Sequence, residues 1–295
     1  MRSQRGLAVV TALLIVAVAA STAALMLAQQ SAMLDQAAMV TVRAQADAYA
    51  QAGIDWARGV LAEDKGRRGD VDSLDEGWAQ PIAALPVERA VVSGVIVDEQ
   101  GKFNLNNLDQ AATPRDKLVF RTLLGSLGLS PDLIGPVSDW VSSTEAPENA
   151  YYLSLAKPYR AANGRMIQVD ELYRVRGFDP AAVAKLRPYV TALPEHTPIN
   201  VNTAPDAVLA ALVGGAQDVV SKIKEKRAAR GGIAKVADFT SIPGVPADIQ
   251  NVDVKSSYFA ASVQVAQDDV RLATDALIAR KVDNSTAIIW RRPRY

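Results

Sequence analysis

The longest hydrophobic run of the chain lies at its N-terminus. Arg2 and Arg5 precede Gly6, and no charged residue follows until Asp35. At a rise of about 1.5 Å per residue, about 20 apolar residues cross a bilayer core of roughly 30 Å. The pattern therefore predicts a short basic leader over residues 1–6 and one transmembrane helix over residues 7–28.

Helical periodicity continues beyond this run. Residues 29–62 lack proline and are rich in alanine and glutamine, which favour helix. Apolar side chains recur there at steps of three and four residues, at Met39, Val42, Ala46, Tyr49, Ala50, Ile54, Ala57 and Leu61. We therefore expect one helix from near Leu7 to about Ala62, half in the membrane and half outside it.

Three interpretations of the N-terminal run remain open on this pattern. A secretory signal peptide would end its apolar stretch after about 7–15 residues at a small-residue site such as residues 17–19, whereas this run continues. A signal anchor would hold Arg2 and Arg5 in the cytoplasm. A prepilin-type leader would be cut by prepilin peptidase between Gly6 and Leu7, which leaves the spanning helix at the new N-terminus.

Strand patterns flank the middle of the chain. Residues 63–103 form a polar connector followed by the first strands, because residues 89–97 are rich in valine and isoleucine. Residues 98–101 carry a turn signal, and residues 102–105 are the expected return strand of a hairpin. The C-terminal segment, residues 256–295, contains three further strand patterns, over 258–264, 270–278 and 286–290.

Between these strands the pattern is helical. Residues 104–255 consist of short helical segments separated by glycine and proline. The expected helices cover residues 118–127, 131–141, 169–174, 180–189, 205–213, 218–230, 236–240 and 246–251. The simplest arrangement is an α+β fold, in which the long N-terminal helix packs on a small antiparallel sheet that a large all-helical insertion interrupts.

The helical block contains an internal repeat. Residues 103–109, the first asparagine motif, resemble residues 199–205, the second asparagine motif, at an offset of 96. Residues 169–178 resemble residues 236–245 at an offset of 67, so the first copy holds an extra loop, most naturally within residues 142–165. The asparagines of both motifs are expected to cap backbone groups in the loop before a helix; they are Asn104, Asn106, Asn107, Asn200 and Asn202.

The second copy resembles a nucleic-acid module. Residues 199–205, a helix and residues 242–245 are similar to the helix-hairpin-helix units of DNA-binding competence proteins. Such units hold phosphates through the backbone N–H groups of a glycine hairpin and the positive end of a helix. Residues 213–217 depart from the usual Gly-hydrophobic-Gly hairpin, and residues 198–255 hold seven Lys and Arg against six Asp and Glu. Nucleic acid is therefore not expected as a partner, and a membrane-anchored DNA-binding or uptake protein remains the alternative.

Composition supports neither nucleic-acid binding nor thiol chemistry. The chain carries 32 basic and 32 acidic residues, and loss of residues 1–6 would leave a net charge of about −2. It has no cysteine, which excludes a disulfide framework, a thiolate metal site and a cysteine nucleophile. The basic residues of the second copy are expected on a solvated helix face; they are Lys222, Lys224, Lys226, Arg227 and Arg230.

The sequence carries no enzyme pattern. It has no metal-binding histidine pair, no nucleophile elbow and no P-loop. The one histidine, His196, lies in a proline-rich connector and is expected in a surface loop. The carboxylate pairs Asp98/Glu99 and Asp268/Asp269 fall at turns and are expected as surface charge. We therefore predict no catalytic residue and no required cofactor.

One loop combines the donors that calcium requires. Calcium binds six to eight oxygen atoms from carboxylates, amides, backbone carbonyls and water. Asp139, Glu145, Glu148 and Asn149 are closely spaced oxygen donors, without the spacing of an EF-hand. These four residues are the candidate metal ligands, and a solvated acidic loop is the alternative.

Taken with the leader and the split sheet, several motifs resemble the type II secretion system protein K family of minor pseudopilins. The likeness extends over nearly the whole chain, and its motifs are residues 55–58, 101–108, 151–153, 158–163, 176–179 and 198–205. The resemblance implies a pseudopilin fold whose helical insertion holds two helix-hairpin-helix or SAM-like repeats, and a role without catalysis. A minor pilin of a type IV pilus would share the leader but not the split insertion.

The resemblance also implies processing, location and partners. Prepilin peptidase would cleave between Gly6 and Leu7, and Leu7 would then be N-methylated. The product would be a single-pass inner-membrane protein with a cytoplasmic leader and a C-terminal domain in the periplasm. The implied partners are the minor pseudopilins I, J and H, met through exposed apolar positions of residues 29–61, and secreted exoproteins are further candidates.

In that family role the complex primes pseudopilus assembly and caps its tip, so that the growing filament pushes folded proteins across the outer membrane. Most pilins carry a glutamate at the fifth position after cleavage, where it neutralises the N-terminal amine of a neighbouring subunit in the membrane. This chain has Thr11 there, as the family does, and a subunit at the tip has no neighbour above it that needs this partner. The family also binds calcium in its insertion, although residues 142–144 here are Ser-Ser-Thr where more carboxylates are typical.

Overall fold

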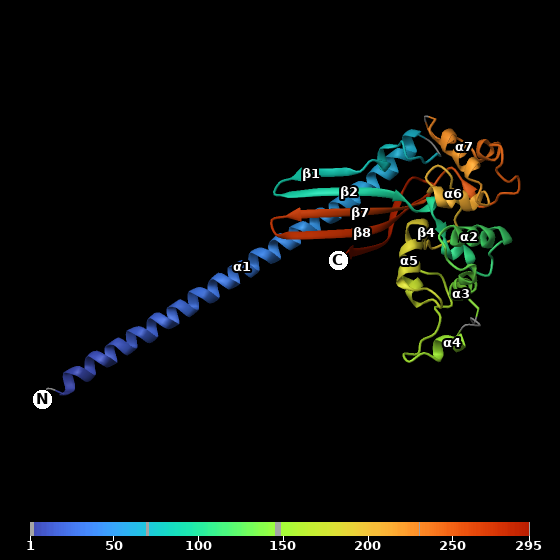
Figure 1. Cartoon of the computed structure of the whole chain (residues 1–295). Helices are drawn as coiled ribbons and strands as arrows, with labels where there is room; N and C mark the ends of the chain where they lie inside the picture. Colours follow the sequence, from blue (N-terminus) through green and yellow to red (C-terminus); the bar gives the residue numbers. More distant parts are fainter. Residues whose placement is uncertain (1–2, 69–70, 145–148, 230, 295) are drawn as a thin grey trace.

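A single long helix organises the computed structural model. The structure describes residues 3–68, 71–144, 149–229 and 231–294. Helix α1 (Ser3–Arg68) runs unbroken for 66 residues, about 100 Å at 1.5 Å per residue, and its N-terminal part projects clear of the other elements (Figure 1). By length and composition it is the one helix of the described chain that could cross a membrane. The predicted long helix is therefore present, and it continues past Ala62 to Arg68.

The two halves of α1 have opposite surroundings. The large apolar side chains between Val9 and Val40 are each more than half exposed. From Ala46 onward one face is buried against the sheet, and the residues of this face are Ala46, Ala50, Ile54, Ala57 and Leu61. The apolar residues predicted at steps of three and four positions thus form the stripe of α1 that packs on the sheet.

The sheet has five antiparallel strands in the order β1-β2-β7-β8-β9. Their bounds are β1 (Ile82–Val87), β2 (Ala90–Asp98), β7 (Tyr258–Gln267), β8 (Val270–Arg280) and β9 (Thr286–Arg294). Phe259, Ala261, Val263 and Val265 alternate along β7 and face the core under α1, as the period of two requires. We call α1, the connector (residues 71–81) and this sheet the body.

Strands β2 and β7 are neighbours in the sheet, although they are far apart in the sequence. Strand β2 pairs with β7 from Ala90 opposite Gln267 to Asp98 opposite Phe259. The chain therefore leaves the sheet after Asp98 and returns beside the same point at Tyr258, so the intervening residues, 99–255, form an insertion at one end of the sheet. The prediction of one sheet interrupted by an insertion is confirmed.

Two predictions in the connector region are wrong. Residues 82–87, assigned to the polar connector, form the edge strand β1, which tolerates Pro86 because an edge strand needs fewer ladder hydrogen bonds. Residues 102–105 do not return along β2. Instead Phe103 and Asn104 form β3 (Phe103–Asn104), which pairs in parallel with β4 (Val190–Thr191) inside the insertion.

The insertion is mostly helical but not all-helical, because it also contains two small parallel pairs, β3 with β4 and β5 with β6. The predicted helix over residues 246–251 is a turn, and α4 lies in a stretch where no helix was expected. The remaining elements are η2 (Glu99–Gly101), η3 (Leu105–Leu108), α2 (Pro114–Ser126), η4 (Pro131–Leu133), α3 (Ile134–Val141), α4 (Asn149–Leu153), η5 (Val169–Arg174), α5 (Pro180–Leu186), η6 (Arg187–Tyr189), β5 (Ile199–Asn200), α6 (Asp206–Leu212), α7 (Gln217–Arg227), α8 (Val236–Thr240) and β6 (Val252–Asp253).

Local capping explains where α2 begins. Thr113 accepts a hydrogen bond from the backbone N–H of Asp116, and the Asp116 carboxylate accepts one from the backbone N–H of Thr113. Pro114 then occupies the first helical position, where its missing N–H costs nothing. This capping box starts the helix four residues before the predicted position, Leu118.

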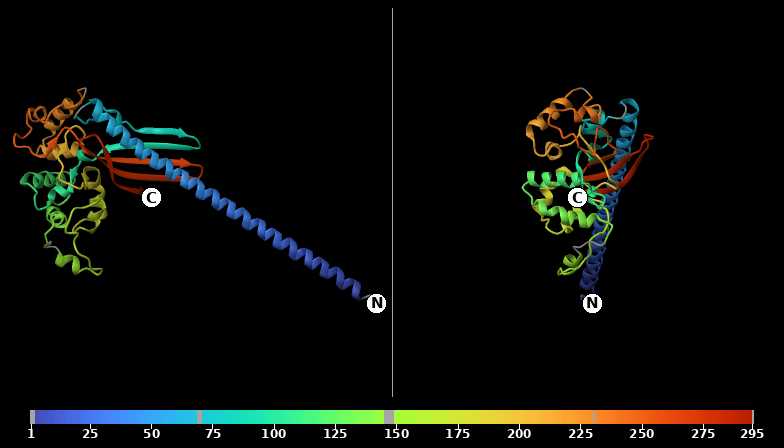
Figure 2. Two further views of the ribbon diagram at one scale, coloured as in Figure 1. Left: turned by 180° about the vertical axis from the view of Figure 1, so that it is seen from behind. Right: turned by 90° about the vertical axis from the view of Figure 1, so that its right-hand side faces the viewer.

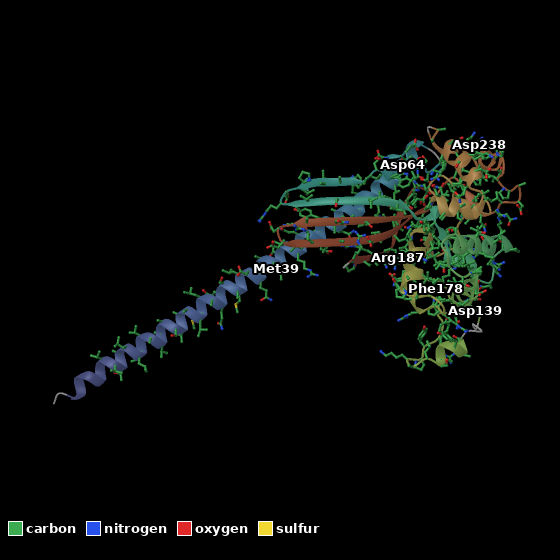
Figure 3. All side chains as sticks on the ribbon, viewed as in Figure 1. Met39, Asp64, Asp139, Phe178, Arg187 and Asp238 are labelled. Atoms are coloured by element: carbon green, nitrogen blue, oxygen red, sulfur yellow. The ribbon has the colours of Figure 1, made fainter. Side chains whose placement is uncertain are left out.

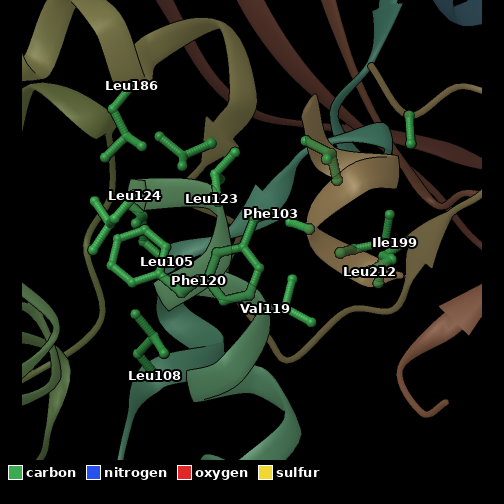
Figure 4. Close-up of a cluster of buried hydrophobic side chains, with 14 of the residues drawn as sticks. Phe103, Leu105, Leu108, Val119, Phe120, Leu123, Leu124, Leu186, Ile199 and Leu212 are labelled. Atoms are coloured by element: carbon green, nitrogen blue, oxygen red, sulfur yellow. The ribbon is translucent and has the colours of Figure 1, made fainter. Parts of the chain in front are cut away.

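Body and insertion have separate hydrophobic cores. The body core joins the buried face of α1 to the inner face of the sheet and to Trp78 of η1 (Gly77–Ala79). The insertion core surrounds Phe103 and Phe120, whose rings stack at 5.2 Å between centroids (Figure 4). Figures 1 and 2 show the insertion at the end of the sheet that lies away from the N-terminus of α1.

Candidate functional site

The predicted processing site lies in the first turns of α1. Gly6 and Leu7 are both within the helix, and Thr11 is exposed one turn further along. Cleavage between Gly6 and Leu7 stays a prediction. The helix continues without a break through this point, so a chain that began at Leu7 would begin directly with the apolar run.

An apolar groove of about 270 Å³ lies where α1 crosses the first two strands. Tyr49, Gly53 and Trp56 of α1 form one wall, and β1 contributes Ile82 and Leu85 to the other. Trp56 is 52% exposed and Leu85 is 51% exposed, although both are large apolar side chains. Gly53 sets the depth of the groove, because a Cβ atom there would lie 2.8 Å from a methyl group of Val263.

The exposed apolar residues predicted as a partner surface continue down the helix from this groove. Met33, Leu34, Met39 and Val40 are each more than 60% exposed outside the predicted membrane span. Single exposed apolar residues are normal, but four large ones within eight residues of a helix are a candidate contact surface.

Two of the four predicted calcium ligands lie among the described residues, on either side of residues 145–148. Asp139 is half-buried near the end of α3, and Asn149 is buried at the start of α4 (Figure 3 labels Asp139). The Oδ1 atom of Asn149 accepts a hydrogen bond of 3.0 Å from the backbone N–H of Ala161. Glu145 and Glu148 lie outside the described residues.

One oxygen atom that the sequence did not single out belongs to the same loop. Asn163 has a positive φ of 47°, and its Oδ1 is buried without a hydrogen-bond partner among the described residues. Its neighbour Gly164 donates to the backbone carbonyl of Trp140, the residue that follows Asp139. A buried amide oxygen without a partner is the type of donor that a hard cation takes, so Asn163 fits calcium by donor type.

The first asparagine motif binds segments inside the insertion. The Asn104 Oδ1 atom accepts from the backbone N–H groups of Asn106, at 3.1 Å, and of Leu193, at 3.1 Å. Its Nδ2 donates to the backbone carbonyl of Glu195 and to the hydroxyl of Thr197. The predicted local cap is present, but most of the bonds are long-range links that the motif alone does not reveal.

The second motif repeats this local turn but reaches the body. Asn200 Oδ1 accepts from the backbone N–H of Asn202 at 2.9 Å. The Asn200 Nδ2 group lies within hydrogen-bond distance of the Asp72 carbonyl, the Asp98 carboxylate and the Ser256 hydroxyl, at 3.0–3.1 Å. Since Asp72 and Asp98 belong to the body and Ser256 leads directly into β7, Asn200 joins the two parts of the molecule.

Asp98 is the centre of this junction, which corrects its assignment to surface charge. It is 4% exposed and accepts four hydrogen bonds, from the backbone N–H of Gln100, the side chains of Asn200 and Thr203, and the hydroxyl of Ser256. Burial raises the pKa of Asp98 to about 6. Four donors and no described acceptor around the carboxylate favour its ionised form at neutral pH.

A second group of carboxylates lies next to Asp98, where α1 ends beside the insertion (Figure 3 labels Asp64). Arg280 donates to both oxygens of Asp72, at 2.5 and 2.6 Å, and lies 4.0 Å from Asp64. Oxygens of Asp64, Asp72 and Glu76 all lie within 4.8 Å of one another. Burial raises the pKa of Asp72 and raises that of Glu76 to about 7.

The position of Arg280 in the sequence indicates this cluster, although Arg280 was not among the predicted site residues. Arg280 ends a strand, β8, whose last residues are otherwise apolar, and a charged residue at such a position indicates a buried partner. Arg280 is 5% exposed. The partner, Asp72, lies 208 residues earlier, so the sequence could not identify it.

The basic residues of α7 are only partly a solvated face. Lys222 and Lys224 are exposed and pair with Asp218 and Asp206. Arg227 is instead held against the second motif, where it donates to the backbone carbonyls of Asn202 and Ala204. The prediction is correct for the lysines and wrong for Arg227, and Arg230 lies outside the described residues. Two of the basic groups are already neutralised, which weakens a phosphate-binding interpretation.

The single histidine occupies the predicted loop. His196 follows β4, and its Nε2 atom lies 2.9 Å from the Asp109 carboxylate. The side chain of His196 is 34% exposed. This contact joins the first motif to the loop after β4. Among the described residues it places no other candidate catalytic group beside the histidine.

Two protein-family models and the known relatives identify the same family. Residues 101–195 and 199–261 match two models described as type II secretion system (T2SS), protein K. A type II secretion system protein K of Pseudomonas aeruginosa is 33% identical over 98% of this chain and 93% of its own length. Another, of Aeromonas hydrophila, is 31% identical over 98% of this chain and 97% of its own length.

A solved structure shares the fold. A chain of the GspK-GspI-GspJ complex from enterotoxigenic Escherichia coli superimposes with a TM-score of 0.76 and 22% sequence identity. The match covers 86% of this chain and 97% of that chain. The arrangement of long helix, antiparallel sheet and inserted helices is therefore shared with that protein.

Proposed function

Because this chain belongs to the type II secretion system protein K family, we propose that it is a minor pseudopilin that caps the pseudopilus tip and primes its assembly. In this role it is anchored in the inner membrane by the first half of α1, with the leader in the cytoplasm and the sheet and insertion in the periplasm. It works by assembly rather than by catalysis.

The observation that carries this proposal is the position of the insertion. It lies at the end of the sheet away from the N-terminus of α1, and it extends sideways from the line of the helix (Figures 1 and 2). Subunits of a helical filament stack their long helices in parallel, so an identical subunit placed above would have to pass through the insertion. A chain of this shape fits the last position of a filament.

Thr11 supports a place at the tip of the filament for an electrostatic reason. In a stacked filament, a glutamate five residues after the cut would neutralise the amine of the next subunit. A tip subunit has no such neighbour, and an unpaired carboxylate in the membrane costs several kcal/mol, on the order of 3. A threonine at this position is therefore favourable only where no amine has to be matched.

The proposed partners are the minor pseudopilins I, J and H of the same system. A solved complex holds a K protein together with its I and J proteins, and that K protein has the fold described above. The exposed apolar residues between Met33 and Val40 of α1 and the groove at Trp56 and Leu85 are the surfaces that best fit such partners.

The first experiment is the intact mass of the membrane-extracted chain, produced with and without prepilin peptidase. The proposal expects loss of residues 1–6 and addition of one methyl group, only when the peptidase is present. A Gly6→Leu variant serves as the uncut control. An uncut chain, or a chain cut near Ala19, would overturn the pseudopilin assignment and leave the anchored DNA-binding alternative, for which binding of duplex DNA should fall steeply with salt.

A second experiment tests the tip position. Thr11→Glu should lower secretion by more than Thr11→Gln, because only the glutamate introduces an unmatched charge. Equal and normal secretion by both variants would show that the electrostatic argument is wrong.

A third experiment tests the partner surface. Leu85→Glu, in the groove, should weaken copurification with the I and J proteins by at least about tenfold, because a carboxylate would be buried in an apolar contact. Ile289→Glu is the matched control, since Ile289 is 44% exposed on β9, at the opposite edge of the sheet. An equal loss for both variants would remove the groove from the proposed interface.

We also propose that the insertion binds calcium through Asp139, Glu145, Glu148 and Asn149, with Asn163 as a further oxygen donor. A bound ion would tie α3, α4 and the extra loop together without taking part in any reaction. Calcium should raise the thermal midpoint of the wild-type chain in EGTA-treated samples and should not raise that of Asp139→Asn. The control Asp132→Asn, at an exposed position, should respond like the wild type.

A further inference from the structure

The body and the insertion meet through polar groups rather than through one apolar core. Of the described residues, Leu193, Tyr258 and Leu277 form the small apolar cluster between the two parts. The rest of the junction holds buried polar side chains, which are Asp72, Asp98, Asn200, Ser256 and Arg280. Hydrogen bonds and charge therefore decide how firmly the insertion is held.

The junction carries an excess of negative charge among its described side chains. Asp64 comes from α1, Asp72 and Glu76 from the connector, Asp98 from the end of β2, and Arg280 from the end of β8. The insertion contributes Asn200 and Thr203, which are neutral. Four carboxylates thus face one guanidinium, and the side chains of residues 65–70 are not described.

The four carboxylates are not equivalent. The Asp72 carboxylate binds Arg280 directly and also accepts a 2.7 Å hydrogen bond from the backbone N–H of Ser256. Asp98 is saturated by its four donors. Glu76 accepts a hydrogen bond of 2.5 Å from the indole N–H of Trp78 and has no ion-pair partner among the described residues.

Glu76 also faces the carboxyl group of Asp64, because oxygen atoms of the two side chains lie within 4.8 Å of each other. Two carboxyl groups can share a hydrogen bond only when one of them carries a proton, because two carboxylate ions have no donor and repel each other. Of the two, Asp64 lies 4.0 Å from the Arg280 guanidinium, whereas Glu76 has no ion-pair partner among the described residues. The geometry therefore assigns the proton to Glu76.

We propose that this junction is a proton-operated latch. The proton on Glu76 bridges to Asp64 and lets the connector pack against the end of the sheet. Loss of that proton places two facing carboxylates in the buried cluster, and their repulsion loosens the connector. The insertion is loosened with it, because Asp72 holds Asn200 through its carbonyl and Asp75 accepts from the backbone N–H of Gly231.

The direction of the pH effect follows from the proton balance. Burial raises the pKa of Glu76 from its ordinary value of 4.5 to about 7 in the folded chain. The folded state then binds more protons than the unfolded state between these values, so this contribution to stability falls as the pH rises from about 4.5 to about 7. Above pH 7 it is lost, and below pH 4.5 it is fully present.

Thermal unfolding of the full chain in detergent, in the presence of EDTA, tests the proton. The wild-type midpoint should fall by several degrees between pH 5 and pH 8.5. Glu76→Gln, which imitates the protonated side chain, should match the wild type at pH 5 and exceed it at pH 8.5. Glu225→Gln, the same change at an exposed position on α7, should follow the wild type throughout.

Distance measurement between spin labels tests the movement. The chain has no cysteine, so Asp269→Cys in the exposed turn of the body and Lys226→Cys in the insertion give one defined pair. The distance distribution should be narrow at pH 5.5 and broader at pH 8.5 in the wild-type background. In the Glu76→Gln background it should be narrow at both.

Two results would overturn the latch. One is a Glu76→Gln chain that is destabilised equally at both pH values, which would make Glu76 a packing residue only. The other is a distance distribution that does not respond to pH although the midpoint does. If Glu76→Gln fails to fold, Asp64→Asn takes its place, because it removes the charge that faces the ionised glutamate and should reduce the broadening at pH 8.5.

Discussion

In the first asparagine motif, Asn104 donates to two neutral acceptors, the Glu195 carbonyl and the Thr197 hydroxyl, whereas in the second motif Asn200 donates to the buried carboxylate of Asp98. The two residues are equivalent in the repeat, and both accept a hydrogen bond from the residue two positions on. The same local structure therefore serves two tasks. One copy ties the insertion to itself, and the other ties it to the body.

The next asparagine of each motif keeps a common task. Asn106 accepts from the backbone N–H of Met166 and donates to its carbonyl, and Asn202 does the same with Ile233. Met166 and Ile233 are 67 residues apart, which is the offset found by comparing the sequences of the two copies. The repeat is thus conserved in its internal contacts and differs where it meets another part of the molecule.

The largest expected effect separates Asn200 from Asn104. Asn200→Ala should reduce the free energy of unfolding by about 4 kcal/mol at pH 8, because it leaves a buried carboxylate short of a donor. The loss should shrink below pH 6, where Asp98 gains a proton. Asn104→Ala should cost about 2 kcal/mol at every pH, since its partners are neutral. Denaturant titrations at pH 5 and pH 8 measure both, and parallel pH profiles would contradict the comparison.

The conserved task predicts equal effects at the next position. Asn106→Ala and Asn202→Ala should each cost about 2 kcal/mol, because they remove the partner of the backbone N–H and C=O of Met166 and of Ile233. Asn106→Ala also removes a donor from the carbonyl of Leu193. Hydrogen exchange should localise the opening to the Met166 segment in one variant and to the Ile233 segment in the other. A cost that differs by more than about 1 kcal/mol would show that the copies are less alike than their hydrogen bonds suggest.

A glycine tests how closely the second motif packs against η2, the turn that follows β2. A Cβ atom at Gly101 would lie 2.9 Å from the backbone carbonyl of Thr203, which cannot move away without displacing the motif. Gly101→Ala should therefore cost about 1–3 kcal/mol. Gly125→Ala in α2 is the control, because nothing lies within 4 Å of its Cβ position, and this change should raise stability by about 0.5–1 kcal/mol. The thermal midpoints of the two variants should move in opposite directions.

The smallest expected effect concerns Thr203. Its hydroxyl donates to the Asp98 carboxylate at 2.5 Å, and three other donors remain when it is removed. Thr203→Val should cost about 1.5 kcal/mol above pH 6 and less below it. Asn107 is the equivalent residue in the first motif and pairs with the backbone of Thr197, so Asn107→Ala should show no such pH dependence.

The local features of this chain were accessible from its sequence. The apolar steps between Ala46 and Leu61 define the buried face of α1 because a helix repeats every 3.6 residues. The strands β2, β7, β8 and β9 were predicted because they are rich in valine and isoleucine. Strand β1 was missed because Pro81 precedes it and Pro86 lies within it. The predicted calcium ligands Asp139 and Asn149 lie in α3 and at the start of α4, and only the folded chain adds Asn163, whose Oδ1 is buried without a partner among the described residues.

The long helix, the interrupted sheet and the repeat follow from periodicity and short motifs, which are properties of neighbouring residues. The burial of Asp98, the removal of Arg227 from the solvated face and the contact of Asn200 with the body depend instead on how distant segments pack. Their partners lie up to 158 residues away along the chain, as Asp98 and Ser256 do. Whether a carboxylate is surface charge or the centre of a junction depends on which donors the fold brings to it, and no local pattern records that.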